Sequence, residues 1–139
     1  MNTGSAELPT DKPVVVADDD AVTRSLLSGI LRRMGFAVVA EVRDGHKALA
    51  AFERHRPGVV CLDIEMPGLS GFEVLAKIRE ASSEVTVLLI TAAATESNVR
   101  SAIEAKADGV IAKPFSAATI AKEIARAVSR SAAGGSTEP

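Results

Sequence analysis

Five short apolar runs, rich in β-branched residues, alternate along the chain with segments whose apolar residues recur every three or four positions. The runs lie at 14–17, 36–42, 59–64, 85–90 and 109–112. Leu27, Leu31 and Met34 illustrate the helical spacing of the intervening segments. Alternating strands and helices favour a parallel sheet covered on both faces, and nearly continuous apolar runs indicate strands buried on both sides. The sequence therefore predicts an α/β fold with five parallel strands and five helices.

Length and composition limit the chain to one domain and exclude several kinds of protein. A length of 139 residues matches a single domain, and no apolar run is long enough to span a membrane. The net charge of −2 gives no general attraction to nucleic acid or anionic lipid. The single cysteine, Cys61, excludes a disulfide framework and fits a reducing compartment. We expect a cytoplasmic domain over 13–131, with flexible tails at 1–12 and 132–139.

Polar residues follow four of the five predicted strands. An aspartate triplet, 18–20, ends the first strand, and Asp63, Thr91 and Lys113 end the third, fourth and fifth. The carboxyl ends of parallel strands meet at one edge of a sheet, where ligands bind in such folds. Carboxylates gathered there repel one another unless a cation joins them, and oxygen ligands alone favour Mg²⁺ or Mn²⁺. With a threonine hydroxyl and a lysine ammonium beside it, this edge resembles a phosphoryl-transfer site.

Asp63 is the candidate nucleophile of this site, because it stands alone at the end of a central strand. Attack by its carboxylate on a phosphoryl group would give an aspartyl-phosphate. Simpler structural roles also exist for the polar residues taken singly. Asp20 is predicted to cap the following helix, a lone threonine at a strand end is often structural, and a lone lysine is often a solvated charge. Such roles do not explain four strand ends that carry complementary chemistry.

Four stretches, VVVADDDAVTR, CLDIEMPGLSGFEVL, LLITA and ADGVIAKPF, resemble the receiver domain of two-component response regulators in content, order and spacing. The resemblance extends from about residue 14 to residue 130. It implies a doubly wound, flavodoxin-like sheet with strand order 2-1-3-4-5. It also implies a phosphorylation-controlled signalling switch of a two-component or phosphorelay system, which accepts a phosphoryl group from a phosphohistidine on another protein.

The resemblance also assigns roles to individual residues. It implies that Mg²⁺, or Mn²⁺ in its place, is bound directly by Asp19, through water by Asp18, and by the phosphorylation site Asp63. The backbone carbonyl of Glu65 completes the protein ligands.

Two further residues contact the phosphoryl group in the resembled family. The resemblance implies that Thr91 holds a phosphoryl oxygen after transfer and that Lys113 pairs with the same group. It also implies a cis peptide bond between Lys113 and Pro114. The family often has an aromatic switch residue three positions before the lysine, where this chain has Val110, and the chain contains neither Tyr nor Trp. We therefore expect a switch through Thr91 with little rotamer change at Val110.

The resemblance also implies the partners. The phosphoryl donor would be a sensor histidine kinase or a histidine phosphotransfer protein, since His46 and His55 are expected on the surface, away from the strand ends. We also expect an output surface at the fourth helix (about 95–106), the fifth strand and the fifth helix (about 117–130), because Thr91 and Lys113 border these elements. This surface would bind a downstream protein or a second copy. We expect no direct contact with nucleic acid or membrane, and a stand-alone regulator or an isolated receiver domain.

Two other functions are compatible with parts of this sequence. The stretch 14–22 also fits the opening motif of haloacid-dehalogenase-like phosphatases, with Asp18 as the nucleophile and Asp20 as the acid or base. That enzyme class needs a further acidic pair after the lysine and leaves Asp63 without a role. A receiver-like binding module that has lost phosphorylation usually lacks parts of the site, whereas this chain retains each part. We therefore expect no enzyme beyond one that catalyses its own phosphorylation and dephosphorylation.

Overall fold

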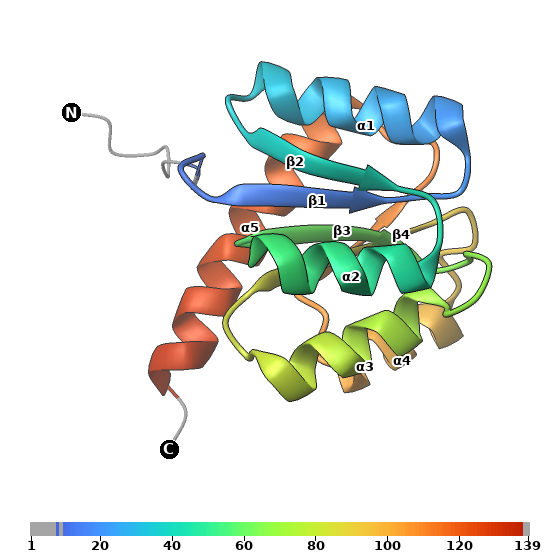
Figure 1. Cartoon of the computed structure of the whole chain (residues 1–139). Helices are drawn as coiled ribbons and strands as arrows, with labels where there is room; N and C mark the ends of the chain where they lie inside the picture. Colours follow the sequence, from blue (N-terminus) through green and yellow to red (C-terminus); the bar gives the residue numbers. More distant parts are fainter. Residues whose placement is uncertain (1–7, 9, 138–139) are drawn as a thin grey trace.

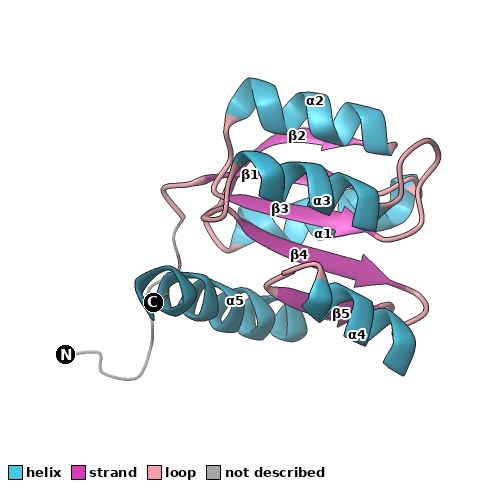
Figure 2. Cartoon of the chain, turned by 90° about the horizontal axis from the view of Figure 1, so that it is seen from below, coloured by secondary structure: helices cyan, strands magenta, loops and turns pink. Residues whose placement is uncertain are grey.

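The computed structural model describes residue 8 and residues 10–137. It contains a single sheet whose five parallel strands have the order β2-β1-β3-β4-β5, which confirms the predicted fold class (Figures 1 and 2). The strands are β1 (Pro13–Ala17), β2 (Ala37–Val42), β3 (Val59–Asp63), β4 (Thr86–Thr91) and β5 (Gly109–Ala112). The helices are α1 (Ala21–Arg33), α2 (Gly45–His55), α3 (Gly71–Ala81), α4 (Glu96–Glu104) and α5 (Ala117–Thr137).

Burial of the strands explains their sequence pattern. Every residue of β3 and β4 is buried, and so are four of the five residues of β1, because helices cover both faces of these central strands. Strand β2 lies at an edge of the sheet, and its residues alternate between exposed and half-buried. Burial on both faces, which the sequence predicts for the apolar runs, therefore holds for the three central strands and not for β2 or β5.

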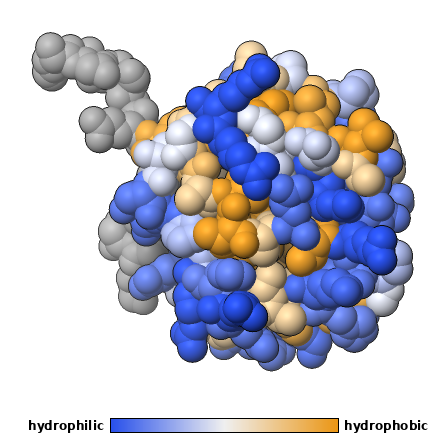
Figure 3. Space-filling view, turned by 45° about the horizontal axis from the view of Figure 1, so that its top comes forward, coloured by the Kyte–Doolittle hydropathy of each residue, from blue (hydrophilic) through white to orange (hydrophobic). Residues whose placement is uncertain are grey.

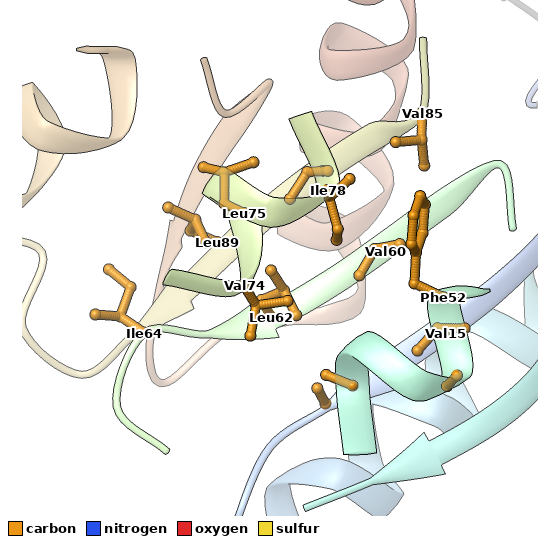
Figure 4. Close-up of a cluster of buried hydrophobic side chains, with 14 of the residues drawn as sticks. Val15, Phe52, Val60, Leu62, Ile64, Val74, Leu75, Ile78, Val85 and Leu89 are labelled. Atoms are coloured by element: carbon orange, nitrogen blue, oxygen red, sulfur yellow. The ribbon is translucent and has the colours of Figure 1, made fainter. Parts of the chain in front are cut away.

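Two apolar cores lie on opposite faces of the sheet. On one face α2 and α3 pack against it through residues such as Phe52 and Leu75 (Figure 4). Helix α4 packs on the same face through Ala102. On the other face α1 and α5 pack through residues such as Leu31 and Ile124. Each fully buried side chain of this size contributes about 1.5–3 kcal/mol relative to an exposed one. These cores fix the strands, and the strand ends carry the polar residues.

Polar side chains place the beginnings of the helices that follow β1, β3 and β4. Asp20 accepts a hydrogen bond from the backbone N–H of Thr23 and caps α1, as the sequence predicts. Ser70 and Glu73 form a reciprocal capping box at the start of α3. Thr95 caps α4 by accepting from the N–H of Asn98. These caps fix the first turns of the helices next to the loops that carry the candidate site.

The end of α5 differs from the sequence prediction. The sequence places the end of this helix near residue 130 and a tail at 132–139, whereas α5 continues to Thr137. Alanine and serine at 129–133 favour or tolerate helix, and glycines weaken it without the steric block of proline. Residues 138–139 lie outside the described residues.

The tail predicted at 1–12 falls mostly on residues 1–7 and 9, which are also outside the described part of the chain. Leu8, which the structure describes, is half-buried and packs against the core beneath α1 and α5. The surface seen with α1 turned forward is mainly hydrophilic, with separate apolar patches (Figure 3). Among the described helices, none is both long and apolar enough to cross a membrane.

Candidate functional site

Three carboxylates converge at the carboxyl edge of the sheet. Asp18 follows β1, Asp19 is its neighbour, and Asp63 ends β3, whose carboxyl end lies beside that of β1 (Figure 1). One carboxylate oxygen from each of the three lies within 4.8 Å of the other two. Asp18 and Asp63 are buried, whereas Asp19 is exposed. The structure thus brings together the acidic residues that the sequence singled out, with one of them open to solvent.

Lys113 lies among these carboxylates at the end of β5. Its Nζ is 2.8 Å from Oδ2 of Asp18 and donates a hydrogen bond to Oδ2 of Asp63 at 3.2 Å. The peptide bond to Pro114 is cis, as the resemblance implies. Partial burial disfavours the charged ammonium, but the contacts with the two carboxylates outweigh this effect and raise the pKa of Lys113. The ammonium therefore stays charged and offsets part of the acidic charge.

The surroundings of Asp63 oppose the ionisation of its carboxyl group. Burial and the neighbouring charge of Asp18 raise its pKa, while Lys113 and the backbone N–H of Glu65 act in the opposite direction. The Glu65 N–H donates to Oδ1 of Asp63 at 3.2 Å, and Glu65 itself is exposed to solvent. Because burial and Asp18 destabilise the ionised carboxylate of Asp63, an added positive charge would stabilise it.

The loop after β1 holds Asp18 through its neighbours. Asp18 Oδ1 accepts a hydrogen bond from the N–H of Asp20 at 2.9 Å, and Arg24 donates from Nη1 to the carbonyl oxygen of Asp18 at 2.8 Å. The hydrogen bonds from Thr23 lower the pKa of Asp20, which serves the helix cap and is not part of the acidic cluster. Sequence reasoning missed Arg24, although its place one turn into α1 put it within reach of the loop.

The loop after β3 approaches the site so closely that glycine is required. A Cβ at Gly71 would lie 2.5 Å from the carbonyl oxygen of Asp63, and the N–H of Gly71 donates to Ile64. Gly68 has a positive φ of 80°, and a Cβ there would lie 2.8 Å from Cδ2 of His46. Neither Gly71 nor His46 was predicted to support the site. Gly71 follows Ser70, a residue type that favours helix caps, and this was the one sequence signal that the loop ends close to Asp63.

Thr91 is placed at the same edge but is not hydrogen-bonded to the acidic cluster. Its side chain is fully buried, and Oγ1 accepts a hydrogen bond from the N–H of Ala93 at 2.9 Å. Its carbonyl oxygen accepts from the N–H of Lys113 at 2.8 Å, which joins the ends of β4 and β5. Val110, the predicted second switch position, is half-buried and packs against the core under α2, α3 and α4.

The donor set fits a hard divalent cation. The cluster offers only oxygen ligands, and Mg²⁺ typically uses one or two carboxylates while it keeps several waters. The exposed side of Asp19 leaves room for such waters. The added positive charge would also relieve the repulsion between Asp18 and Asp63 that raises the pKa of Asp63. The residues present therefore suit Mg²⁺ and, with the same ligands, Mn²⁺.

Comparison with known proteins gives one consistent family. The family model described as the response regulator receiver domain matches residues 14–125. The chemotaxis protein CheY of Bacillus subtilis is 33% identical over 80% of this chain and 92% of its own. The transcriptional regulatory protein CseB of Streptomyces avermitilis is 39% identical over 84% of this chain. This chain spans only about half (48%) of the length of that regulator.

Solved structures agree with the sequence relatives. The signal receiver domain of the putative response regulator NarL from Mycobacterium tuberculosis is 33% identical, with a TM-score of 0.78 over 85% of this chain and 96% of the other. The Borrelia burgdorferi CheX–CheY complex with BeF₃ and Mg²⁺ matches at 28% identity, with a TM-score of 0.78 over 81% of this chain and 85% of the other. The chain belongs to the response regulator receiver domain family of two-component signalling, whose members bind Mg²⁺ at an acidic pocket.

Proposed function

We propose that the chain is a phosphorylation-controlled switch whose acceptor is Asp63. The observation that carries this proposal is the convergence of Asp18, Asp19 and Asp63 within 4.8 Å, with the Lys113 ammonium in contact with two of them. A carboxylate oxygen of Asp63 attacks the phosphorus of a phosphohistidine, so that a P–O bond forms and the P–N bond breaks. The imidazole leaves with the electron pair of that bond and takes up a proton.

The metal site belongs to the same proposal. Asp18, Asp19, Asp63 and the backbone carbonyl of Glu65 would hold Mg²⁺, which Mn²⁺ can replace. The ion supplies positive charge against the crowded carboxylates and the incoming phosphoryl group. Asp19 suits direct contact because it is the exposed member of the cluster, and Asp18 suits contact through water because it already pairs with Lys113.

Lys113 and Thr91 would act on the phosphoryl group once it is on Asp63. Lys113 already donates to Oδ2 of Asp63, so its ammonium is close enough to donate to the phosphoryl oxygens once Asp63 is phosphorylated. The Thr91 oxygen accepts from Ala93 in this structure, and its O–H can still donate to a phosphoryl oxygen. No substrate other than the donor is implied, and the chain would catalyse only its own phosphorylation and dephosphorylation.

The donor would be a second protein, a sensor histidine kinase or a histidine phosphotransfer protein. His46 is exposed on α2, and neither it nor His55 belongs to the acidic cluster. A pocket of about 330 Å³ opens beside Lys113, lined in part by Leu26 and Phe115. Together with the exposed Leu26, this pocket offers the donor protein an apolar surface next to Asp63. We propose that this encounter takes place in the cytoplasm.

The output surface would consist of α4, β5 and α5. Thr91 and Lys113 border these elements, and Ile103 on α4 is an apolar side chain left 66% exposed. Relatives include a chemotaxis protein and transcriptional regulators, and the Borrelia CheY was solved with CheX. A downstream protein or a second copy of this chain would bind there, either to a stand-alone regulator or to a receiver within a longer protein.

The proposal is tested by incubating the chain with a small-molecule phosphodonor and Mg²⁺ and mapping the acyl phosphate by mass spectrometry. We expect one phosphoryl group on Asp63, none in Asp63→Asn, and none after chelation of divalent cations. Asp20→Asn is the matched control, because it removes a nearby carboxylate that is not in the cluster, and it should still be labelled. Labelling of Asp18 would instead support the phosphatase alternative, and no labelling would support a binding module.

A further inference from the structure

Two consecutive hydrogen bonds join the end of β4 to α4. The N–H of Ala93 donates to Oγ1 of Thr91 at 2.9 Å. The carbonyl oxygen of the same residue, Ala93, accepts from Nδ2 of Asn98 at 2.8 Å. Asn98 is the third residue of α4, and its own N–H is held by the cap residue Thr95. A displacement of the Thr91 hydroxyl therefore reaches the first turn of α4 through the peptide groups of Ala93.

The opposite end of α4 is held by a different group. Arg79, on α3, donates from Nε to the carbonyl oxygen of Lys106 at 3.0 Å and from Nη2 to Asp108 at 2.8 Å. Asp108 also accepts from the backbone N–H of Val87 in β4. These contacts fix the turn between α4 and β5 to α3 and to the start of β4. Among the described residues, Thr91 takes no part in the hydrogen bonds of this group.

Between its two ends, α4 is packed loosely. Ala102 is its only buried residue, and Ile103 is 66% exposed. The helix is nine residues long and packs mainly on β5. Burial of one small side chain stabilises the packing of a short helix only slightly. The contacts at the two ends of α4 therefore determine its orientation.

We propose that Asn98 is a positioning residue that couples the Thr91 hydroxyl to the first turn of α4, and that α4 pivots about the end held by Arg79. The inference rests on the proposed function, since a phosphoryl group on Asp63 is what would displace Thr91. A hydroxyl can donate its proton to a phosphoryl oxygen while it still accepts from an N–H. Movement of Thr91 toward the phosphoryl group thus moves Ala93 through the bond to its N–H. It also moves Asn98 through the bond to the Ala93 carbonyl oxygen.

The test removes the Asn98 donor without removing the helix. Asn98→Asp has nearly the same shape but no N–H₂ group, and a carboxylate in the first turn favours the helix. Ser97→Asp is the matched control, because it adds the same charge at an exposed neighbouring position and keeps the Asn98 amide. Backbone amide chemical shifts of the full chain are recorded with Mg²⁺, before and after addition of the phosphate mimic beryllofluoride.

In the unsubstituted chain and in Ser97→Asp, we expect mimic-induced shifts in α4 that decrease from Val99 toward Glu104. In Asn98→Asp, these α4 shifts should fall about twofold or more, while the shifts at Glu65 and Lys113 remain, because the ligand still binds. Full α4 shifts in Asn98→Asp, or equal shifts along α4 in the unsubstituted chain, would overturn the inference while leaving the proposed function intact. Absence of shifts at Glu65 and Lys113 in the unsubstituted chain would overturn both.

Discussion

The ammonium of Lys113 lies 2.8 Å from Oδ2 of Asp18, closer than its 3.2 Å distance to Asp63. Asp18 is the more deeply buried of the two carboxylates, and its side chain is only 2% exposed. The end of β5 is thereby linked to the ends of β1 and β3. Lys113 thus has two roles at this edge, since it neutralises the carboxylates that would hold a cation and is also the proposed partner of the phosphoryl group.

Lys113→Ala should therefore separate metal binding from the response to phosphorylation. Mg²⁺ should bind with at least the affinity of the unsubstituted chain, because a competing positive charge has been removed from the acidic cluster. The response of α4 to beryllofluoride should fall several-fold, because the phosphoryl oxygens lose a charge-assisted contact. Metal titration and amide chemical shifts measure the two effects.

Lys122→Ala is the control for this experiment, because Lys122 is an exposed lysine on α5. Lys122→Ala should leave both the Mg²⁺ affinity and the α4 response to beryllofluoride unchanged. An undiminished α4 response in Lys113→Ala would contradict the coupling role assigned to Lys113.

Asp63→Asn should stabilise the chain in the absence of divalent cations. Burial and Asp18 raise the pKa of Asp63, so its ionised form costs folding free energy that a neutral amide does not. We expect the free energy of unfolding at neutral pH to rise by about 1 kcal/mol, because Lys113 and the Glu65 N–H already offset part of the penalty. Urea unfolding followed by circular dichroism suits a chain without Trp or Tyr.

The pH dependence of this gain follows from the direction of the shift. A carboxyl with a raised pKa in the folded state binds its proton more tightly there than in the unfolded chain. Its penalty is present above the folded pKa and disappears as the pH falls through it. The advantage of Asp63→Asn should therefore shrink on acidification, and also on addition of Mg²⁺, which binds the carboxylate. An advantage independent of both pH and Mg²⁺ would contradict this origin.

Asp19→Asn and Asp20→Asn should differ in their effect on metal affinity. Asp19 belongs to the cluster of three carboxylates, whereas Asp20 accepts hydrogen bonds from Thr23 as the cap of α1. We expect Asp19→Asn to weaken Mg²⁺ binding by roughly tenfold or more, and Asp20→Asn to change it little. Titration of both variants with Mg²⁺ measures this difference. Equal losses of affinity would show that Asp20 is also a ligand.

The sheet and its helices were predictable because burial on both faces leaves a direct signature in the sequence. Strands β3 and β4 consist almost entirely of apolar residues, and the polar residues Asp63 and Thr91 mark where they end. The end of α5 was not predictable from composition. The small and polar residues at 131–137 are compatible with both a tail and a helix, since their helix propensities span only about 1 kcal/mol per residue.

The acidic cluster followed from topology, because parallel strands bring their carboxyl ends to one edge. The contacts that support it did not follow. The position of Arg24 near the start of α1 puts it within reach of the loop, but residue types do not show that it contacts the backbone carbonyl of Asp18. The bond from Asn98 to the carbonyl of Ala93, in the loop after β4, is equally hidden in the sequence. The roles of Glu65 and Val110 remain predictions that depend on the family resemblance.

Asp108→Ala should be one of the most destabilising single substitutions outside the acidic cluster. Asp108 and Arg79 form an ion pair at 2.8 Å whose side chains are only 11% and 12% exposed. Burial raises the pKa of Asp108, against the effects of the Val87 N–H and Arg79. Removal of the carboxylate leaves that N–H without its side-chain acceptor and Arg79 with a buried charge. We expect a loss of about 3 kcal/mol in the free energy of unfolding.

Glu41→Ala is the matched control for Asp108→Ala, since it also removes a carboxylate from an arginine. Glu41 and Arg32 pair at 2.9 Å, but their side chains are 31% and 53% exposed, so water can replace the lost partner. The loss of unfolding free energy should be about 0.5 kcal/mol. Urea unfolding at two salt concentrations measures both variants, and only the Glu41 effect should depend strongly on salt. The backbone carbonyls of Lys106 and Val85 also accept hydrogen bonds from Arg79. Similar losses of unfolding free energy in the two variants would show that these carbonyls are enough to stabilise the buried charge of Arg79.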